Sequence, residues 1–206
     1  MLFPFAKSDS IISSVPPETI PILIIFVSIV GFTIIIERLV YYWKLKMIPS
    51  EVFKRVRELV REKKYDDAKD VIGNETQSPA SVLLLLSLEL KRRNVEYWED
   101  DVRQEGFRQI YLMEKYLTGL GTIATIAPLL GVLGTVIGIV RSFAEGAGTK
   151  GAEVGISEAL VTTAMGLGVA IPAYIFYNYF SRMKEERITE MENVTDLVLP
   201  HLSKSK

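Results

Sequence analysis

Charged residues divide the chain into apolar and polar blocks. Three stretches without a formal charge, of 18, 25 and 23 residues, are Thr19 to Ile36, Tyr116 to Val140 and Ala159 to Ser181. An α-helix rises about 1.5 Å per residue, and about 17–25 apolar residues cross the hydrocarbon core of a bilayer. We therefore expect three retained transmembrane helices. With their flanking residues, these helices are expected to cover residues 19–43, 116–141 and 154–181.

Helix start and stop signals fill the long connection between the first two spans. These signals are Pro49-Ser50, Gly73-Asn74 and Ser78-Pro79. Proline is common in the first turn of a helix, and Gly or Asn commonly ends one. The run from Ser81 to Leu88 is apolar but too short to span a membrane, so we interpret it as one buried helical face. Because no strand pattern competes, the sequence predicts an all-α fold.

Spans two and three are expected to continue as helices beyond the membrane. From about Val95 the helical pattern runs without a proline into the second span, and no proline follows Pro172 until Pro200. A proline inside a helix would break or kink it. Both spans are therefore expected to extend into a cytoplasmic helical bundle.

The distribution of lysine and arginine indicates an orientation in the membrane. Of the 24 lysines and arginines, 16 lie between the first two spans and five follow the third. Connections rich in these residues stay on the cytoplasmic side. The leader also lacks the basic cluster of a signal peptide, so we expect it to be retained outside. The expected outer segments are residues 1–18 and 142–153, and the expected cytoplasmic segments are residues 44–115 and 182–206.

The composition argues against several functional classes. The formal net charge is −1 without a basic excess, which argues against nucleic acid as a partner. Cysteine is absent, so disulfides and thiolate chemistry are excluded. The single histidine, His201, lies near the C-terminus, where neither a catalytic triad nor a histidine-based metal site is expected. The sequence therefore predicts no cofactor, no metal and no enzyme.

Small and weakly polar residues gather on one face of the second span. At about 100° per residue they fall within roughly 60° of Thr135, and the opposite face carries leucine, isoleucine and valine. Small residues let membrane helices approach closely, so we expect tight packing along this face, with Gly134 contributing beside it. The face consists of Gly121, Ala124, Pro128, Gly131, Thr135, Gly138 and Ser142.

The third span carries two different faces next to each other. The small face consists of Ala159, Thr163, Gly166, Ala170 and Ala173. About 100° around the helix lies the second face, with Glu158, Thr162, Met165, Val169 and Phe176. Gly168 is expected to support packing, and Pro128 and Pro172 to bend their helices. The first span is isoleucine and valine nearly all round, so we place it at the lipid side.

The polar residues of these spans each allow two interpretations. Glu158 either lies at the outer interface, where the dipole at a helix N-terminus favours an anion, or faces a wet cavity at membrane depth. The threonine hydroxyls either bond to their own helix backbone or line a polar path. The residues themselves leave both interpretations open.

Two longer motifs resemble a known family. They are "IAPLLGVLGTVIGIVRSF" (residues 126–143) and "GISEALVTTAMGLGVAIPAYIFYNYFSR" (residues 155–182). Both resemble the MotA/TolQ/ExbB proton channel family and are most similar to its ExbB/TolQ branch. The segment "IIIERLVYY" after the first span is similar to that branch as well.

The resemblance implies an assembly in the bacterial inner membrane. It implies a homo-oligomeric ring, pentameric in the better-known members, that encloses two copies of a single-span partner like ExbD or TolR. Protons would pass between the ring and the partner, whose transmembrane aspartate is the titrating group. The energy would reach an energiser like TonB or TolA and serve the outer membrane.

The resemblance also implies roles for individual residues. Glu158 matches the family's glutamate in "EAL", Thr135 its threonine in "GTV", and Thr163 its threonine in the third span. Pro128 and Pro172 match prolines of the MotA branch. On a straight helix Thr162 lies about 40° from Glu158, whereas Thr163 lies about 140° away, so Thr162 is a geometric candidate. Either the helix twists at Gly166 to Gly168, or Glu158 and Thr163 contact different neighbours.

A function of a different class remains as an alternative. A passive membrane scaffold without ion flux would use the small faces and the cytoplasmic helices but would leave Glu158 and Thr135 without a task. A neighbouring reading frame for a short single-span protein with a transmembrane aspartate would favour the proton-driven motor.

Overall fold

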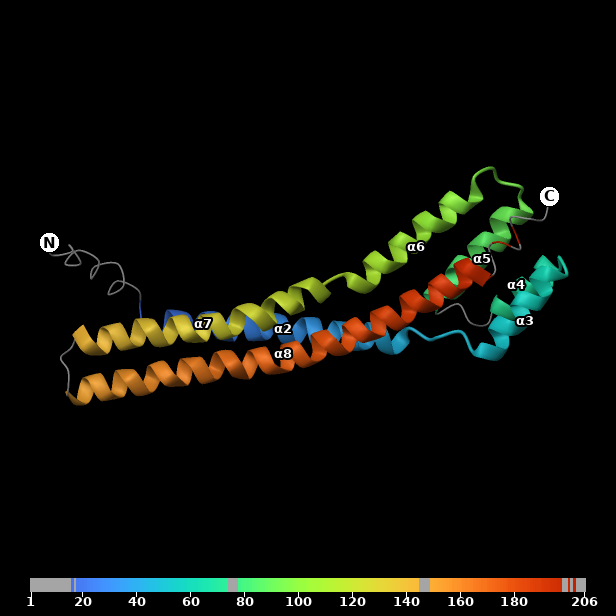
Figure 1. The fold of residues 1–206 in the computed structure, drawn as a ribbon. Coiled ribbons are helices and arrows are strands. Elements are labelled where there is room, and N and C mark those ends of the chain that lie inside the picture. Colours follow the sequence, from blue (N-terminus) through green and yellow to red (C-terminus); the bar gives the residue numbers. More distant parts are fainter. Residues whose placement is uncertain are drawn as a thin grey trace. The chain divides into compact units, whose positions relative to one another are not determined.

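The computed structural model describes residues 16, 18–73, 78–144, 149–197, 200 and 202. Most of the expected outer leader, residues 1–18, and His201 lie outside these residues. The described part is helical and contains no strand, so the predicted all-α class is confirmed for it. Its helices, labelled in Figure 1, are α2 (Thr19–Lys44), α3 (Ser50–Arg61), α4 (Tyr65–Gly73), α5 (Pro79–Arg92), α6 (Trp98–Glu114), α7 (Leu117–Ala144) and α8 (Lys150–Leu197).

Three helical stretches of the described chain are long and apolar enough to cross a membrane. They are Thr19–Lys44, Trp98–Ala144 and Lys150–Asp196. The second stretch includes α6 and α7, and its apolar part is α7, which has a single basic residue in its last turn, Arg141. The third stretch belongs to α8, which runs for 48 residues without interruption. The predicted extension of the third span into a long helix is therefore confirmed as far as Leu197.

The second span does not continue α6 as one helix, and this prediction was wrong. α6 ends at Glu114 and α7 begins at Leu117. Between them Lys115 leaves the helical conformation with a ψ of 131°, and Tyr116 has a φ of 65°. Such a left-handed conformation is uncommon for a residue other than glycine. Neither proline nor glycine stands at this position, so the chain carries no local signal for the break.

Residues distant in sequence stabilise this helix end. Arg38 Nη1 donates to the carbonyl oxygens of Leu112 and Met113 at 3.0 and 3.2 Å. The Tyr42 hydroxyl also donates to the Met113 carbonyl, at 3.0 Å. The last carbonyls of a helix have no partner within it, and a cation near them is favoured by the helix dipole. Arg38, only 2% exposed, therefore lets α6 end without leaving buried acceptors unpaired.

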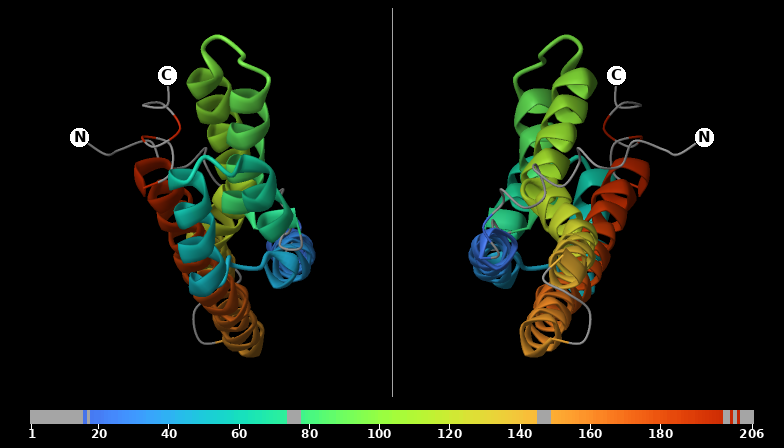
Figure 2. Two further views of the ribbon diagram at one scale, coloured as in Figure 1. Left: turned by 90° about the vertical axis from the view of Figure 1, so that its right-hand side faces the viewer. Right: turned by 90° about the vertical axis from the view of Figure 1, so that its left-hand side faces the viewer.

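The chain divides into two compact units. The first unit combines Met1–Ile36 with Thr118–Asn178, and the second combines Glu37–Leu117 with Tyr179–Lys206. In the first unit the apolar parts of α2, α7 and α8 run side by side (Figures 1 and 2). α2 packs on α7, where Ile123 lies against Gly31 and Ile34 lies against Gly119. Much of the remaining surface of α2 is exposed and apolar, including Phe26, Ile29 and Phe32.

The second unit has a conventional hydrophobic core. It is built from α3 to α6 and the C-terminal part of α8. The apolar run from Ser81 to Leu88, which is too short to span a membrane, contributes the buried Leu83, Leu84 and Leu88, as predicted. The other buried core residues are Val56, Leu59, Val60, Ala68, Ile72, Ala80, Trp98, Val102, Met113, Met191, Val194 and Leu202.

Two side chains of α8 hold the linker between α2 and α3. Arg187 Nη2 donates to the carbonyl oxygen of Leu45 at 2.8 Å. One turn further along α8, Glu190 accepts from the backbone N–H of Ile48 at 2.5 Å and from the Ser78 hydroxyl at 3.3 Å. Burial raises the pKa of Glu190 above its ordinary value of 4.5, although these hydrogen bonds and the charge of Arg187 oppose the rise.

The raised pKa of Glu190 predicts a pH-dependent stability. The folded protein binds the proton of Glu190 more tightly than the unfolded chain does. The stabilisation by this proton is present at low pH and is lost as the pH rises through the pKa of the folded state. Glu190→Gln should therefore raise the midpoint of thermal unfolding at pH 7 more than at pH 4. Glu192→Gln, on an exposed residue of the same helix, is the control and should change neither midpoint. A Glu190→Gln midpoint shifted equally at both pH values would contradict this prediction.

Candidate functional site

The small faces of α7 and α8 meet in the first unit. A Cβ atom added to Gly131 would lie 3.1 Å from the Cα of Thr163, and one on Gly138 would lie 2.5 Å from the Cβ of Ala159. A Cβ atom on Gly166 would lie 2.6 Å from the carbonyl oxygen of Ala127. Several of these neighbours are backbone atoms, which cannot move aside as a flexible side chain would. The two helices therefore approach as closely as glycine allows.

Thr135 and Thr163 lie together at this contact. Their hydroxyl groups are hydrogen-bonded to each other, and either can be the donor. The Thr135 hydroxyl can also donate to the carbonyl oxygen of Ala159 at 3.0 Å or to that of Gly131 at 3.2 Å. The Thr163 hydroxyl reaches the same Gly131 carbonyl at 3.1 Å. Because a hydroxyl donates only one hydrogen at a time, the pair has several alternative donor patterns.

Thr162 takes no part in this hydroxyl pair. It is 6% exposed, and its hydroxyl donates to the carbonyl oxygen of Glu158 in its own helix at 3.2 Å. Its methyl group packs where Gly134 has no side chain, so a Cβ atom on Gly134 would clash with it. The main contacts of Thr162 are therefore packing contacts.

Glu158 lies in a different environment from the threonine pair. Its side chain is exposed and lines a groove of about 1110 Å³, formed by the start of α2, the end of α7 and the start of α8. Among the described residues, the other charged residues that line this groove are Glu18, Arg141 and Lys150. Thr162 lines it as well, whereas Thr135 and Thr163 do not. Within the first unit Glu158 and Thr163 thus have different neighbours.

The helices remain continuous at the glycines and prolines that were singled out. α8 is α-helical through Gly166 and Gly168, and Pro172 lies inside it. Pro128 likewise lies inside α7. No heavy atom outside its own stretch of helix lies within 4 Å of a Cβ atom added to Gly168, so this glycine makes no close contact within the chain.

A further groove of the first unit was missed by the sequence analysis. Thr118, Thr122 and Thr125 of α7 line it together with two tyrosines of α8, Tyr174 and Tyr177. A threonine hydroxyl in a helix often bonds to the carbonyl four residues earlier, so these threonines gave no reason to single them out. The spacing of the tyrosines, three residues apart on one helical face, is the signal that was available.

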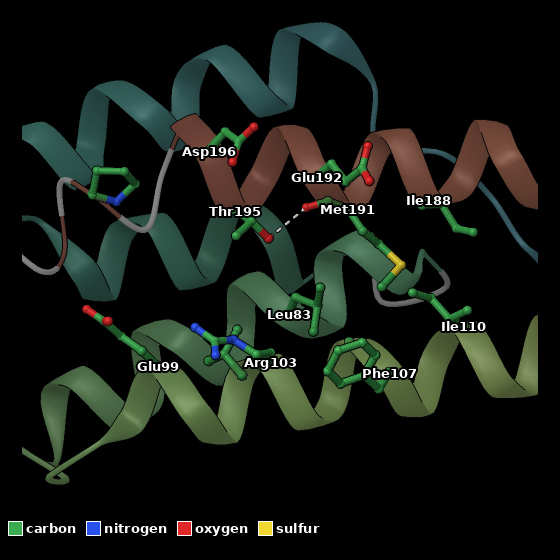
Figure 3. A pocket seen from close by; sticks show the side chains of 13 residues that line it. Leu83, Glu99, Arg103, Phe107, Ile110, Ile188, Met191, Glu192, Thr195 and Asp196 are labelled. Atoms are coloured by element: carbon green, nitrogen blue, oxygen red, sulfur yellow. Dashed lines mark hydrogen bonds between the residues drawn. The ribbon is translucent and has the colours of Figure 1, made fainter.

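A groove of the second unit is lined mainly by apolar residues. It has a volume of about 560 Å³ and lies between α5, α6 and α8, with Leu83 and Met191 among its lining residues (Figure 3). The hydroxyl of Thr195 is used within α8, where it donates to the carbonyl oxygen of Met191 at 3.1 Å. The charged residues that line this groove are Glu99, Arg103, Glu192 and Asp196.

The first unit contains side chains that can take part in proton exchange. Hydroxyl groups donate and accept hydrogen bonds in turn, and a carboxylate takes up and releases a proton. Among the described residues no group of three or more His, Cys, Asp and Glu side chains is arranged to hold a metal ion. The candidate site therefore consists of the Thr135–Thr163 pair and the groove that contains Glu158.

The sequence is similar to a known protein family and to several of its members. Residues 73–193 match the model of the MotA/TolQ/ExbB proton channel family. The putative biopolymer transport protein ExbB-like 3 of Synechocystis is 30% identical over 160 residues, 74% of this chain and 76% of that protein. The putative biopolymer transport protein ExbB homolog of Methanothermobacter thermautotrophicus is 30% identical over 174 residues, 82% of this chain and 62% of that protein. The Tol-Pal system protein TolQ of Haemophilus influenzae is 42% identical over 79 residues, 36% of this chain and 35% of that protein.

Proposed function

The chain belongs to the MotA/TolQ/ExbB proton channel family, on its ExbB/TolQ branch, and from this premise we propose that it is a ring subunit of a proton-driven motor in the bacterial inner membrane. The ring is a homo-oligomer, a pentamer by resemblance, that surrounds a single-span partner like ExbD or TolR. Proton flow between ring and partner drives an energiser like TonB or TolA. This energiser supports transport at the outer membrane or the maintenance of the envelope.

The charges and the apolar surface of the subunit support an orientation in the membrane. The second unit, which includes the C-terminal tail, contains most of the lysine and arginine and lies in the cytoplasm, and the N-terminus lies outside. The exposed apolar side chains of α2, such as Phe26 and Phe32, face the lipid. α7 and α8 then line the ring, with Glu158 toward the outer side.

The observation that carries the proposal is the hydroxyl pair of Thr135 and Thr163. Polar groups within a membrane span are costly and are therefore commonly functional. This pair lies between two apolar helices, and its several alternative donor patterns allow a hydrogen to pass from one oxygen to the other. Glu158 supplies a titratable carboxylate on the same helix, and the partner supplies the aspartate.

The test is proton uptake by vesicles that contain the ring with its partner. Thr135→Val keeps the shape of the side chain but removes the hydroxyl, and it leaves buried carbonyl and hydroxyl groups with fewer partners. Such a loss costs about 1–3 kcal/mol, and if it is added to the barrier for proton transfer, uptake should fall about 5- to 150-fold. Thr135→Ser keeps the hydroxyl and should retain most of the uptake.

The control is Thr33→Val in α2. The Thr33 hydroxyl donates to the Ile29 carbonyl at 2.8 Å, so it is used within α2, away from the hydroxyl pair. This variant should behave as the wild type. Equal uptake by the Val and Ser variants at position 135 would show that the Thr135 hydroxyl has no role in proton uptake. Absence of uptake in the wild type with its partner would favour the passive scaffold.

A further inference from the structure

The groove lined by threonine and tyrosine hydroxyls is separate from the sites described so far. It has a volume of about 470 Å³ and lies between α7 and α8 in the first unit. Thr125 precedes Thr135 by ten residues, which corresponds to about 15 Å along α7. Glu158 and Tyr177 are 19 residues apart, or about 28 Å along α8. The hydroxyl groove and the Glu158 groove thus lie at opposite ends of the apolar helices, with the threonine pair between them.

The hydroxyl groove is formed by a close contact between a ring and a glycine. A Cβ atom on Gly121 would lie 2.9 Å from Cε2 of Tyr177, so the ring packs directly on the α7 backbone. The Thr122 hydroxyl donates to the Thr118 carbonyl at 2.9 Å, and the Thr125 hydroxyl donates to the Gly121 carbonyl at 3.0 Å. Both hydrogens are used within α7, so the two threonine oxygens are left as acceptors. The phenol groups of Tyr174 and Tyr177 add hydroxyls that both donate and accept.

The lining of this groove suits water. None of the described residues that line it is charged, and five of them carry a hydroxyl group. One water molecule occupies about 30 Å³ of liquid and needs two to four polar partners, so the space and the partners are both sufficient. A lipid chain would gain little from a wall of hydroxyls, because their polar groups would lose water without receiving new partners.

We propose that the groove between Thr122, Thr125, Tyr174 and Tyr177 is the water-filled inner end of the proton route through the ring. This inference rests on the proposed function and deepens it. Protons that have passed the Thr135–Thr163 pair reach water held by these hydroxyls and leave toward the cytoplasm. The arrangement needs no carboxylate at this end, because a chain of water and hydroxyl groups both donates and accepts protons.

Accessibility to a water-borne thiol reagent tests whether the groove contains water. The chain has no cysteine, so Thr125→Cys introduces a single thiol. The probe is a cationic, membrane-impermeant methanethiosulfonate, added to the complex with its partner from the cytoplasmic side. It reacts with a thiolate, which forms only where water is present. Thr125→Cys should be modified, and Leu129→Cys, one turn away on the exposed apolar surface of α7, should not. Equal lack of reaction at both positions would overturn the proposal, because lipid or a neighbouring subunit would then cover the groove.

Proton uptake tests whether the water belongs to the route. Tyr177→Phe and Thr122→Val remove one hydroxyl each and keep the side-chain shape. Each should lower uptake about two- to tenfold, the effect of losing a hydrogen bond, and the double variant should lower it further. Unchanged uptake in the double variant overturns this inference, whether or not Thr125→Cys is modified. If Thr135→Val still loses uptake in that case, the proposed function stands. If Thr135→Val is also unchanged, the role of the threonine pair fails with it, whereas the proposed function itself fails only if the wild type with its partner takes up no protons.

Discussion

Gly166→Ala should weaken the contact between α7 and α8 and lower the stability of the first unit. The added Cβ atom would lie 2.6 Å from the Ala127 carbonyl oxygen, 3.0 Å from the Cα of Gly131 and 3.1 Å from its nitrogen. All three are backbone atoms, so only a separation of the helices relieves the clash. Overpacking of this kind costs about 1–3 kcal/mol, which exceeds the gain of about 1 kcal/mol from the better helix propensity of alanine.

Gly168→Ala is the matched control for this prediction. The same methyl group is added two residues further along α8, where no described atom beyond the adjacent stretch of α8 lies within 4 Å of it. Here the helix propensity acts alone, so stability should be unchanged or slightly higher. The measurement is the midpoint of thermal unfolding in detergent, followed by proton uptake with the partner present. Separation of the helices would also part Thr135 from Thr163, so uptake should fall in the Gly166 variant only. Equal midpoints for the two variants would show that the close approach of α7 and α8 is not needed.

The apolar part of the fold could be predicted because its signals are local. The absence of charge over each stretch gives three candidate spans, and the helical period places Thr135 among glycines on one face. The helical period alone does not decide which residue of α8 meets that face, since Thr162 and Thr163 are adjacent and point about 100° apart. The resemblance favoured Thr163, and this residue is hydrogen-bonded to Thr135.

The break between α6 and α7 could not be predicted because its causes are distant in sequence. Nothing near Lys115 and Tyr116 disfavours a helix strongly. The partners that satisfy the end of α6 are Arg38 and Tyr42, more than 70 residues earlier in the chain. In the sequence Arg38 is one of the basic residues that follow the first span and lies in the segment "IIIERLVYY", and neither feature indicates its partners. Its burial and its two carbonyl partners belong to the packing of the second unit, which the helical period alone does not specify.

Glu158 is the residue for which the two interpretations from the sequence give opposite expectations. It is exposed in the groove with Arg141 and Lys150, which brings charges of both signs to one end of the spans. If it is an interfacial anion at a helix N-terminus, its charge contributes only about 0.3–1 kcal/mol to helix stability. Function would then survive its loss. If it exchanges protons on the route, function requires that it ionise.

Glu158→Gln should therefore assemble normally and lose most of its proton uptake. Glutamine keeps the shape and the hydrogen-bonding capacity of glutamate but cannot release a proton. Glu158→Asp keeps an ionisable group on a shorter side chain and should retain part of the uptake. The control is Glu153→Gln, the same chemical change in the first turn of α8, on an exposed residue that does not line the groove. It should leave uptake unchanged. The comparison is made in vesicles that hold the ring with its partner at matched protein levels. If Glu158→Gln and Glu153→Gln take up protons equally, Glu158 is an interfacial anion. The proposed proton route would then depend on the threonine pair and the partner's aspartate alone.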